Sequence, residues 1–385
     1  MKVRFIDGIN RLSASVWQAL VGTNYPFLRH EFLHALEASG SVGAESGWLP
    51  MHLLVESEEG RLLAAMPLYL KSHSYGEYVF DWSWAEAYEN HGLAYYPKLL
   101  AAIPFTPATG QRLVKAADCS DEVTAVVAKA LHDKAQQLGA SGWHVLFSEK
   151  DELAGWTTTG ADMRLGCQFH WQNDSYADFA GFLAAMNSKK RRTIRKERES
   201  LTAQGIRLQQ LTGEAITPAL WQRFQAFYQL TNLKYNRHQG YLMPDFFDRI
   251  YLTMRDSLLL VVAFDGDEVI AGALNFMGSD TLYGRYWGCT REVEFLHFET
   301  CFYQGIDYCI QQGLQRFDSG AQGEHKVPRG FRPTLTYSAH WLVHSGFRDA
   351  VKRFLVEEGA GIRHYRDEMA KALPFRDGDA STGSA

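Results

Sequence analysis

The sequence has few cysteines, and their spacing argues against two common kinds of site. The five are an odd number without a paired CxxC motif, at Cys119, Cys167, Cys289, Cys301 and Cys309. This pattern indicates neither a disulfide framework nor a zinc knuckle. A protein of a reducing cytoplasm fits it best.

Long apolar runs and an excess of positive charge are also missing. The N-terminal residues lack the continuous apolar segment of a signal peptide, and no later run approaches membrane-spanning length. The net charge of −5 argues against nucleic acid or membrane covering the whole surface. We therefore expect a cytoplasmic protein without a membrane span, in which any contact with a polyanion is local.

Two blocks of the sequence recur in the same order. Residues 58–69 match residues 265–276, with an acidic turn followed by an apolar strand, and residues 136–148 match residues 311–319, with a helix end, a glycine and a strand. Such recurrence predicts an internal duplication.

The length supports a division into two domains. A chain of 385 residues is long for one hydrophobic core, and 46% hydrophobic residues suffice to build two. We expect a first domain at 1–185 and a second at 186–375. The small polar residues of 376–385 predict a disordered tail.

The stretch 316–342 gathers charged side chains between two apolar strands. Pro328, Pro333 and three glycines rule out a continuous helix, so the middle must be a loop. Loops at strand ends often carry chemistry, although a solvated loop with incidental charges is the alternative. Only the second copy has this cluster, which consists of Glu324, His325, Lys326, Arg329 and Arg332.

A zinc-type motif lies near the N-terminus. Residues 30–34 spell HExxH, which in zinc proteases places two histidines one helical turn apart with a glutamate as base. No third ligand is marked, and the glycine-containing extension of the motif is absent. We expect no metal site here and keep a zinc hydrolase as the weakest alternative.

A dense basic run connects the two copies. Residues 188–205 have helical propensity and carry seven lysines and arginines close together. The run predicts a phosphate-binding patch for a nucleotide or RNA, whereas a solvated connecting helix is the alternative. The residues that we expect to contact phosphate are Lys189, Arg191, Arg192 and Arg195.

Several blocks together resemble a known family. PFLRHEFLHALE, PFTPATGQRL, SKKRRTIRKE, YGRYWGC and GEHKVPRGFRP are similar to segments of the FemAB-like branch of the GNAT acyltransferase superfamily, which is named for peptidoglycan biosynthesis or recognition. The resemblance covers about residues 26–354. It implies an α/β (α+β) fold of two tandem GNAT-like domains, with mixed central sheets flanked by helices, in agreement with the duplication.

The resemblance also implies an activity. It predicts a transferase that forms an amide on an amino acceptor, a small molecule or cell-wall precursor, and binds no permanent cofactor. The R/Q-x-x-G-x-G/A turn typical of acyl-CoA enzymes does not follow YGRYWGC, so the co-substrate is either acyl-CoA or aminoacyl-tRNA. The alternative is a non-catalytic binding module for RNA or cell-wall precursors.

Attack of an amine on a carbonyl needs a proton acceptor and donors for the developing oxyanion. We expect Lys326 to stabilise the oxyanion or a phosphate. Glu324 or His325 would take the proton, with Asp318 as a further candidate at the strand end.

The remaining candidates would bind substrate. Arginines orient phosphates and carboxylates well, and aromatic side chains can wall a groove. The candidates are Arg329 and Arg332 for anionic groups, Tyr286 and Trp287 for the wall, and Asp81 and Trp84 for an acceptor groove between the domains.

Overall fold

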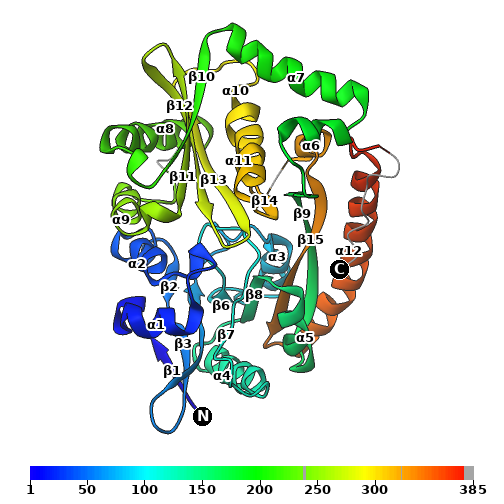
Figure 1. Cartoon of the computed structure of the whole chain (residues 1–385). Helices are drawn as coiled ribbons and strands as arrows, with labels where there is room; N and C mark the ends of the chain where they lie inside the picture. The colour runs from blue at the N-terminus through cyan, green and yellow to red at the C-terminus, as the bar shows by residue number, and fades with distance from the viewer. Residues whose placement is uncertain (237–239, 322, 377–385) are drawn as a thin grey trace. The chain divides into compact units, whose positions relative to one another are not determined.

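The computed structural model describes residues 1–236, 240–321 and 323–376 (Figure 1). The chain forms two compact units. Unit 1 comprises Met1–Cys167 and Leu335–His364, and unit 2 comprises Gln168–Thr334 and the residues from Tyr365 onward. These bounds differ from the expected ranges because the chain returns to unit 1 after Thr334.

Unit 1 contains most of the shorter elements. Its helices are α1 (Ala14–Val21), α2 (His30–Ala38), α3 (Trp82–Asn90), α4 (Val123–Gln137) and α5 (Lys150–Thr158). Its strands are β1 (Lys2–Ile6), β2 (Trp48–Pro50), β3 (His52–Glu56), β4 (Leu62–Met66), β5 (Tyr69–Lys71), β6 (Lys98–Ala101), β7 (Val114–Lys115) and β8 (Gly142–Ser148), with the second half of β15 (Arg332–Leu342).

Two groups of strands build unit 1. One is the antiparallel sheet β1-β3-β4-β7, and the other has the order β2-β5-β6-β8-β15, in which only β6 and β8 pair in parallel. Helix α4 packs here because Val127, Leu131 and Ala135 recur at helical spacing and join the same core as Trp143 of β8. The core of unit 1 thus lies between helix and sheet.

Unit 2 has the longer strands. Its helices are α6 (Phe179–Ala185), α7 (Ser188–Ala203), α8 (Pro218–Asn236), α9 (Pro244–Met254), α10 (Leu296–Phe298), a π-helix η5 (Glu299–Tyr303), α11 (Gln304–Gln312) and a 3-10 helix η6 (Glu324–Arg329). Its strands are β10 (Ile206–Thr212), β11 (Leu258–Asp265), β12 (Glu268–Met277), β13 (Thr281–Cys289) and β14 (Arg316–Asp318), with the second half of β9 (Asp162–Gln172).

The sheet of unit 2 repeats the plan of unit 1. Its order is β10-β11-β12-β13-β14-β9, and only β13 and β14 pair in parallel. Helix α11 lies close against this pair because Gly305 has no side chain: a Cβ there would come within 2.3 Å of the Phe317 ring. The close packing holds β14 against the start of β13, over Thr281–Tyr283.

The matched sequence blocks correspond to matched structure. In unit 1, α4 leads into β8, which pairs in parallel with β6; in unit 2, α11 leads into β14, which pairs in parallel with β13. Each unit is closed by a strand from the other half of the sequence, since β15 completes unit 1 and β9 completes unit 2. The predicted duplication is confirmed.

Two local features differ from what the sequence pattern suggests. The sequence of residues 75–84 alternates like a strand, but 75–81 form a loop and α3 begins at Trp82. The C-terminal helix α12 (Ser345–Lys371) has no counterpart among the matched blocks. Within the described ranges, no helix has the length and apolar character needed to cross a membrane. Most of the expected tail, from 377 onward, lies outside those ranges.

Candidate functional site

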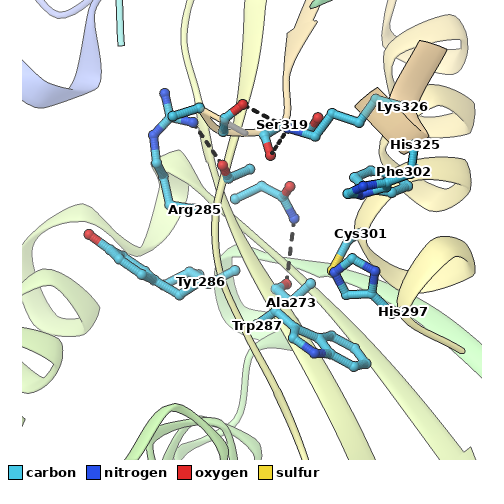
Figure 2. A pocket seen from close by; sticks show the side chains of 15 residues that line it. Ala273, Arg285, Tyr286, Trp287, His297, Cys301, Phe302, Ser319, His325 and Lys326 are labelled. Carbon is cyan, nitrogen blue, oxygen red and sulfur yellow. Dashed lines mark hydrogen bonds between the residues drawn. The ribbon is translucent and has the colours of Figure 1, made fainter. Parts of the chain in front are cut away.

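The parallel strands of unit 2 separate soon after they meet. Strand β14 pairs with β13 only over Thr281–Tyr283, whereas β13 continues to Cys289. A cavity of about 240 Å³ lies beyond the paired part (Figure 2). Its wall is formed by the middle of β12 and of β13, the first helical turns after β13, and the segment that follows β14. The residues are Ala273, Leu274, Asn275, Gly284, Arg285, Tyr286, Trp287, His297, Cys301, Phe302, Ser319, Gly320, Ala321, His325 and Lys326.

Lys326 lies in this wall and is only 3% exposed. Its Nζ donates to the main-chain oxygens of Gly320 at 2.7 Å and Ser319 at 3.2 Å (Figure 2). An ammonium has three N–H groups, and no described residue accepts from the third or brings a carboxylate within 4.0 Å. Burial lowers the pKa of Lys326 to about 8, so the side chain is still mostly protonated at pH 7.

Asp318 lies at the end of β14, 2% exposed, and is ion-paired. Its Oδ2 accepts from Arg285 Nη2 at 2.8 Å, and its Oδ1 accepts from the Gly320 amide at 2.9 Å. Burial by itself would raise the pKa of Asp318, but the neighbouring Arg285 guanidinium outweighs burial and keeps the pKa below its ordinary value. This geometry favours a structural anion over the proton acceptor that the sequence suggested.

The two other proposed proton acceptors occupy different places. Glu324 is exposed, accepts from the Tyr365 hydroxyl at 2.7 Å, and is not part of the cavity wall. The His325 ring does line the cavity, and His297 lies opposite with ring centroids 6.4 Å apart. The sequence pattern gave no sign of His297, which sits in α10 well before the charged loop.

The structure does not bring Arg329 and Arg332 to the cavity. Arg329 Nη2 donates to both oxygens of Glu197, at 3.0 and 3.1 Å, and its guanidinium stacks 3.5 Å from the Phe298 ring centre. Arg332 donates to Gln172 Oε1 at 2.8 Å and is ion-paired with Asp174. Both arginines therefore bind groups of the protein itself, which corrects the expectation that they face a substrate.

Tyr286 and Trp287 both contribute to the wall and point to opposite sides of β13 (Figure 2). The Tyr286 ring packs edge-on against Phe247, with centroids 5.8 Å apart. The Trp287 ring packs edge-on against His297 at 5.3 Å. Trp287 thus belongs to the side of the cavity that carries the imidazoles.

The π-helix η5 supplies the remaining wall. Single π-turns within helices often mark functional sites, and this one places Cys301 and Phe302 at the cavity. Burial raises the pKa of the Cys301 thiol, so it stays protonated near neutral pH and is not an activated nucleophile.

Helix α7 confirms the predicted helix and has two distinct faces. Lys189, Arg192 and Arg195 are exposed, Arg191 is half-buried, and none of the four has an ion pair within the part of the chain that the structure describes. On the inner face Glu197 accepts from Arg329 and from the Tyr303 hydroxyl. The helix therefore offers an uncompensated basic surface and is tied to η6, the element that carries Lys326.

The two candidates in unit 1 are buried, Asp81 to 3% and Trp84 to 4% exposure. Asp81 accepts from the ammonium of Lys98, which also donates to Glu77 at 2.7 Å and Ser74 at 2.8 Å. Trp84 lies under the Arg164 guanidinium, 5.0 Å from its ring centre. Both side chains are engaged within unit 1.

In unit 1, protein groups occupy the space beside the parallel strands that in unit 2 is a cavity. The loop after β6 returns to β8, with the Gly110 amide donating to Phe147 O at 3.0 Å. The fully buried Arg112 donates to the carbonyls of Leu146 at 2.8 Å, Gly110 at 2.9 Å and Ala108 at 2.5 Å. This Arg112 plug, residues 108–112, occupies the edge of β8.

The HExxH motif has local partners. His30 Nε2 lies 3.1 Å from Leu12 O and 3.2 Å from Ile9 O, which makes it a donor to main-chain carbonyls. Glu31 accepts from Gln18 Nε2 at 2.7 Å. Across the described ranges no three His, Cys, Asp or Glu side chains are grouped to hold a metal, so the zinc hydrolase alternative finds no ligand set there.

Comparison with known proteins gives a family and a fold. The family model FemAB-like, described as peptidoglycan biosynthesis/recognition, matches residues 8–377. Among proteins with curated functions, none matches the sequence.

Three solved structures share the fold at low sequence identity. The C-terminal domain of a putative lysylphosphatidylglycerol synthetase from Agrobacterium fabrum is 10% identical with a TM-score of 0.53, over 89% of this chain and 95% of that one. FemX is 12% identical with a TM-score of 0.53, over 91% and 100%. A protein of unknown function from Bacteroides thetaiotaomicron is 9% identical with a TM-score of 0.52, over 88% and 99%. The mixed α/β, tandem GNAT-like architecture expected from the sequence is confirmed.

Proposed function

The chain belongs to the FemAB-like family of peptidoglycan biosynthesis/recognition, and from this premise we propose that it is a GNAT/Fem-type transferase. It moves an acyl or aminoacyl group from a carrier to an amino acceptor and forms an amide. The acceptor is a cell-wall precursor or a small molecule, and the reaction takes place in the cytoplasm. The chemistry is assigned to the cavity of unit 2.

One observation carries the proposal. Lys326 is buried in the cavity wall with two N–H groups held by main-chain carbonyls and a third without an acceptor in the described chain. A fixed cation with a spare donor matches a carbonyl oxygen that becomes negative in the transition state. Because the protein has already oriented the ammonium, little reorganisation is needed when that charge develops.

The bond changes follow from amide formation. The acceptor nitrogen attacks the carbonyl carbon of the donor ester or thioester, and a C–N bond forms while the oxygen becomes an oxyanion beside Lys326. The carbonyl is then restored as the carrier C–O or C–S bond breaks. One proton leaves the nitrogen and is finally taken up by the departing carrier oxygen or sulfur.

The proton acceptor is best sought among the imidazoles. No Asp or Glu belongs to the described cavity wall, whereas His325 and His297 both do. Histidine is the usual general base near neutral pH. We assign the transfer of the proton to His325, with His297 as the second imidazole within the same wall.

The carrier of the acyl group is proposed to be a polyanion. The exposed lysine and arginines of α7 have no carboxylate partners in the described residues, which suits binding to several phosphates. The segment 290–295 after β13 contains Glu292 and Glu294 and no glycine, a composition that does not favour a pyrophosphate there. Aminoacyl-tRNA and acyl-CoA are both carriers of this chemical class.

Ligand-induced stabilisation of the full chain tests the assignment. Acetyl-CoA, aminoacyl-tRNA and a UDP-linked muropeptide are added separately while thermal unfolding is followed. A ligand present at a hundredfold its Kd stabilises by about 2.7 kcal/mol. Failure of all three to raise the Tm would contradict these ligand assignments.

A transfer assay then separates an enzyme from a binding module. Amide product is measured by mass spectrometry for the wild type and Lys326→Met with the ligands that bind. Binding without product in the wild type would favour the alternative, a non-catalytic module for RNA or cell-wall precursors.

A further inference from the structure

We infer that Asp318 is a positioning residue: its carboxylate fixes the Gly320 peptide and Arg285, and the carbonyls of Ser319 and Gly320 in turn hold the Lys326 ammonium in the cavity wall. The inference rests on the proposed function, because it explains how the cation of that site is held. It replaces the role of proton acceptor that the sequence suggested for Asp318.

The first step is the bond from Asp318 to the loop. The Gly320 amide donates to Asp318 Oδ1 at 2.9 Å, which fixes the peptide between Ser319 and Gly320 directly after β14. Gly320 has φ 98°, a conformation that favours glycine. The carboxylate and the glycine together determine where the next carbonyls point.

The second step is the bond from those carbonyls to Lys326. Gly320 O and Ser319 O accept from Nζ at 2.7 and 3.2 Å, so the same short segment that Asp318 anchors holds two of the three ammonium N–H groups (Figure 2). Neither carbonyl carries a full charge. The position of the ammonium therefore depends on the backbone, and the backbone depends on Asp318.

The third step is the clamp between the two strands. Arg285 of β13 donates from Nη2 to Asp318 Oδ2 at 2.8 Å and from Nη1 to Gly284 O at 2.7 Å. The pair lies where β14 ends and the cavity begins, and the Arg285 and Asp318 side chains are each 2% exposed. A desolvated, hydrogen-bonded arginine–carboxylate pair is geometrically specific and fixes the distance between the strands at this point.

The surroundings of Lys326 make Asp318 electrostatically distinctive. Asp318 is the one carboxylate among the charged and titratable groups that influence or face Lys326 in the described chain. Its negative charge favours the protonated form of the Lys326 amine, whereas the positive charge of Arg285 disfavours that form. These groups are Asp318 of β14, Arg285 of β13, His170 of β9, His297 of α10, Cys301 of η5 and His325 of η6.

Two variants remove the carboxylate in different ways. Asp318→Asn deletes the charge but leaves Arg285 buried without its partner, which can prevent folding. The double variant Arg285→Gln with Asp318→Asn replaces the ion pair by two amides of similar size and is expected to fold. Asp245→Asn is the matched control, because Asp245 pairs with Arg249 on the surface of α9 in the same unit.

The primary readout does not require transfer activity. The rate at which acetic anhydride acetylates Lys326 in the full chain is measured by mass spectrometry from pH 6 to 11, which gives the pH at which the amine loses its proton. We expect this pH to be lower in both Asp318 variants than in the wild type, and lowest in the single variant if it folds. Asp245→Asn should match the wild type.

The transfer assay adds a second readout. Displacement of a reacting group by about 1 Å can cost about a hundredfold in rate, so we expect a loss of that order in kcat with a smaller change in KM. Asp318→Glu should recover part of the rate because it restores the carboxylate.

Two results would have different meanings. An unchanged acetylation profile in a folded Asp318 variant would overturn the positioning role. A shifted profile in a protein whose wild type transfers nothing would retain that role for Lys326 and instead remove the proposed function.

Discussion

Each unit buries a lysine beside its parallel strand pair, and the two lysines have different surroundings. In unit 1, Lys98 of β6 donates all three N–H groups, to Ser74, Glu77 and Asp81. In unit 2, Lys326 donates two, both to neutral carbonyls. All three N–H groups of Lys98 are thus accepted within the protein, whereas the third N–H group of Lys326 has no acceptor in the described chain.

The space beside the parallel strands also differs between the two units. The edge of β8 in unit 1 is covered by the Arg112 plug, while the edge of β13 in unit 2 faces a cavity. The duplicated plan therefore leads to one unit whose strand pair is filled and one whose strand pair is open. This difference supports the proposal that the chemistry belongs to unit 2 and that the strand pair of unit 1 serves stability.

Replacing Lys98 by methionine should have the largest effect on stability. It leaves Asp81 buried without its cation and Glu77 with only Lys71, 3.9 Å away, and breaking a buried pair in this way costs about 3–5 kcal/mol. Urea unfolding of Lys98→Met measures the loss. A stability close to that of the wild type would contradict the structural role of Lys98.

Replacing Lys326 by methionine should reduce transfer strongly, with a smaller loss of stability because Ser319 O and Gly320 O lose their donor. Loss of one oxyanion donor lowers kcat by about 10²–10³-fold. The amide product is quantified under saturating donor, and the unfolding midpoint serves as the control for folding. A variant with full turnover would exclude the role assigned to Lys326.

Removing the Arg112 plug should lower the thermal stability of unit 1 without creating a second active site. Arg112→Met leaves buried carbonyls such as Leu146 O without donors, and each unsatisfied group costs about 1–3 kcal/mol. Calorimetry should show a lower Tm, with transfer by unit 2 retained at temperatures where the variant is folded. An unchanged Tm would show that the plug does not stabilise unit 1.

The pH dependence of transfer should identify the charged form of Lys326. Its pKa of about 8 means that the ammonium is present below this pH and is lost as the pH rises through it, so the oxyanion contribution falls about tenfold per pH unit above 8. Lys326→Arg keeps its charge and should lack this alkaline fall. Parallel profiles for the two proteins would refute the assignment.

The smallest effect is expected from substitutions in α7, which should change only the binding of the carrier. Replacing Arg192 and Arg195 by glutamine removes two of the proposed phosphate contacts. The slope of log K for tRNA binding against log salt concentration should then become shallower by about 0.7–0.9 per contact. Fluorescence anisotropy at several salt concentrations gives the slope. An identical slope would show that this face of α7 does not bind the carrier.

The sequence predicted those features that depend on local pattern. The duplication, the helix over 188–203 and the charged loop after β14 could be found because periodicity, glycines and prolines act within a few residues. Lys326 could be singled out because that loop follows directly after a strand. These features sufficed to place one wall of the cavity.

The sequence could not predict which charges neutralise each other across long separations. Arg329 meets Glu197, 132 residues away, and Arg332 meets Asp174, 158 residues away, so both were expected to be free for substrate. His297 reaches the cavity only because α10 folds back after β13. The segment 75–84 alternates like a strand, but Glu77 and Asp81 turn inward to Lys98.

The exchange of closing strands affects how this protein can be taken apart. A fragment cut at 185 would contain β8 without β15, and residues 142–148 would expose the backbone groups that β15 normally satisfies. Such an open strand edge is a template for aggregation. Since each half of the sequence also supplies a strand to the other unit, neither half can complete its sheet alone.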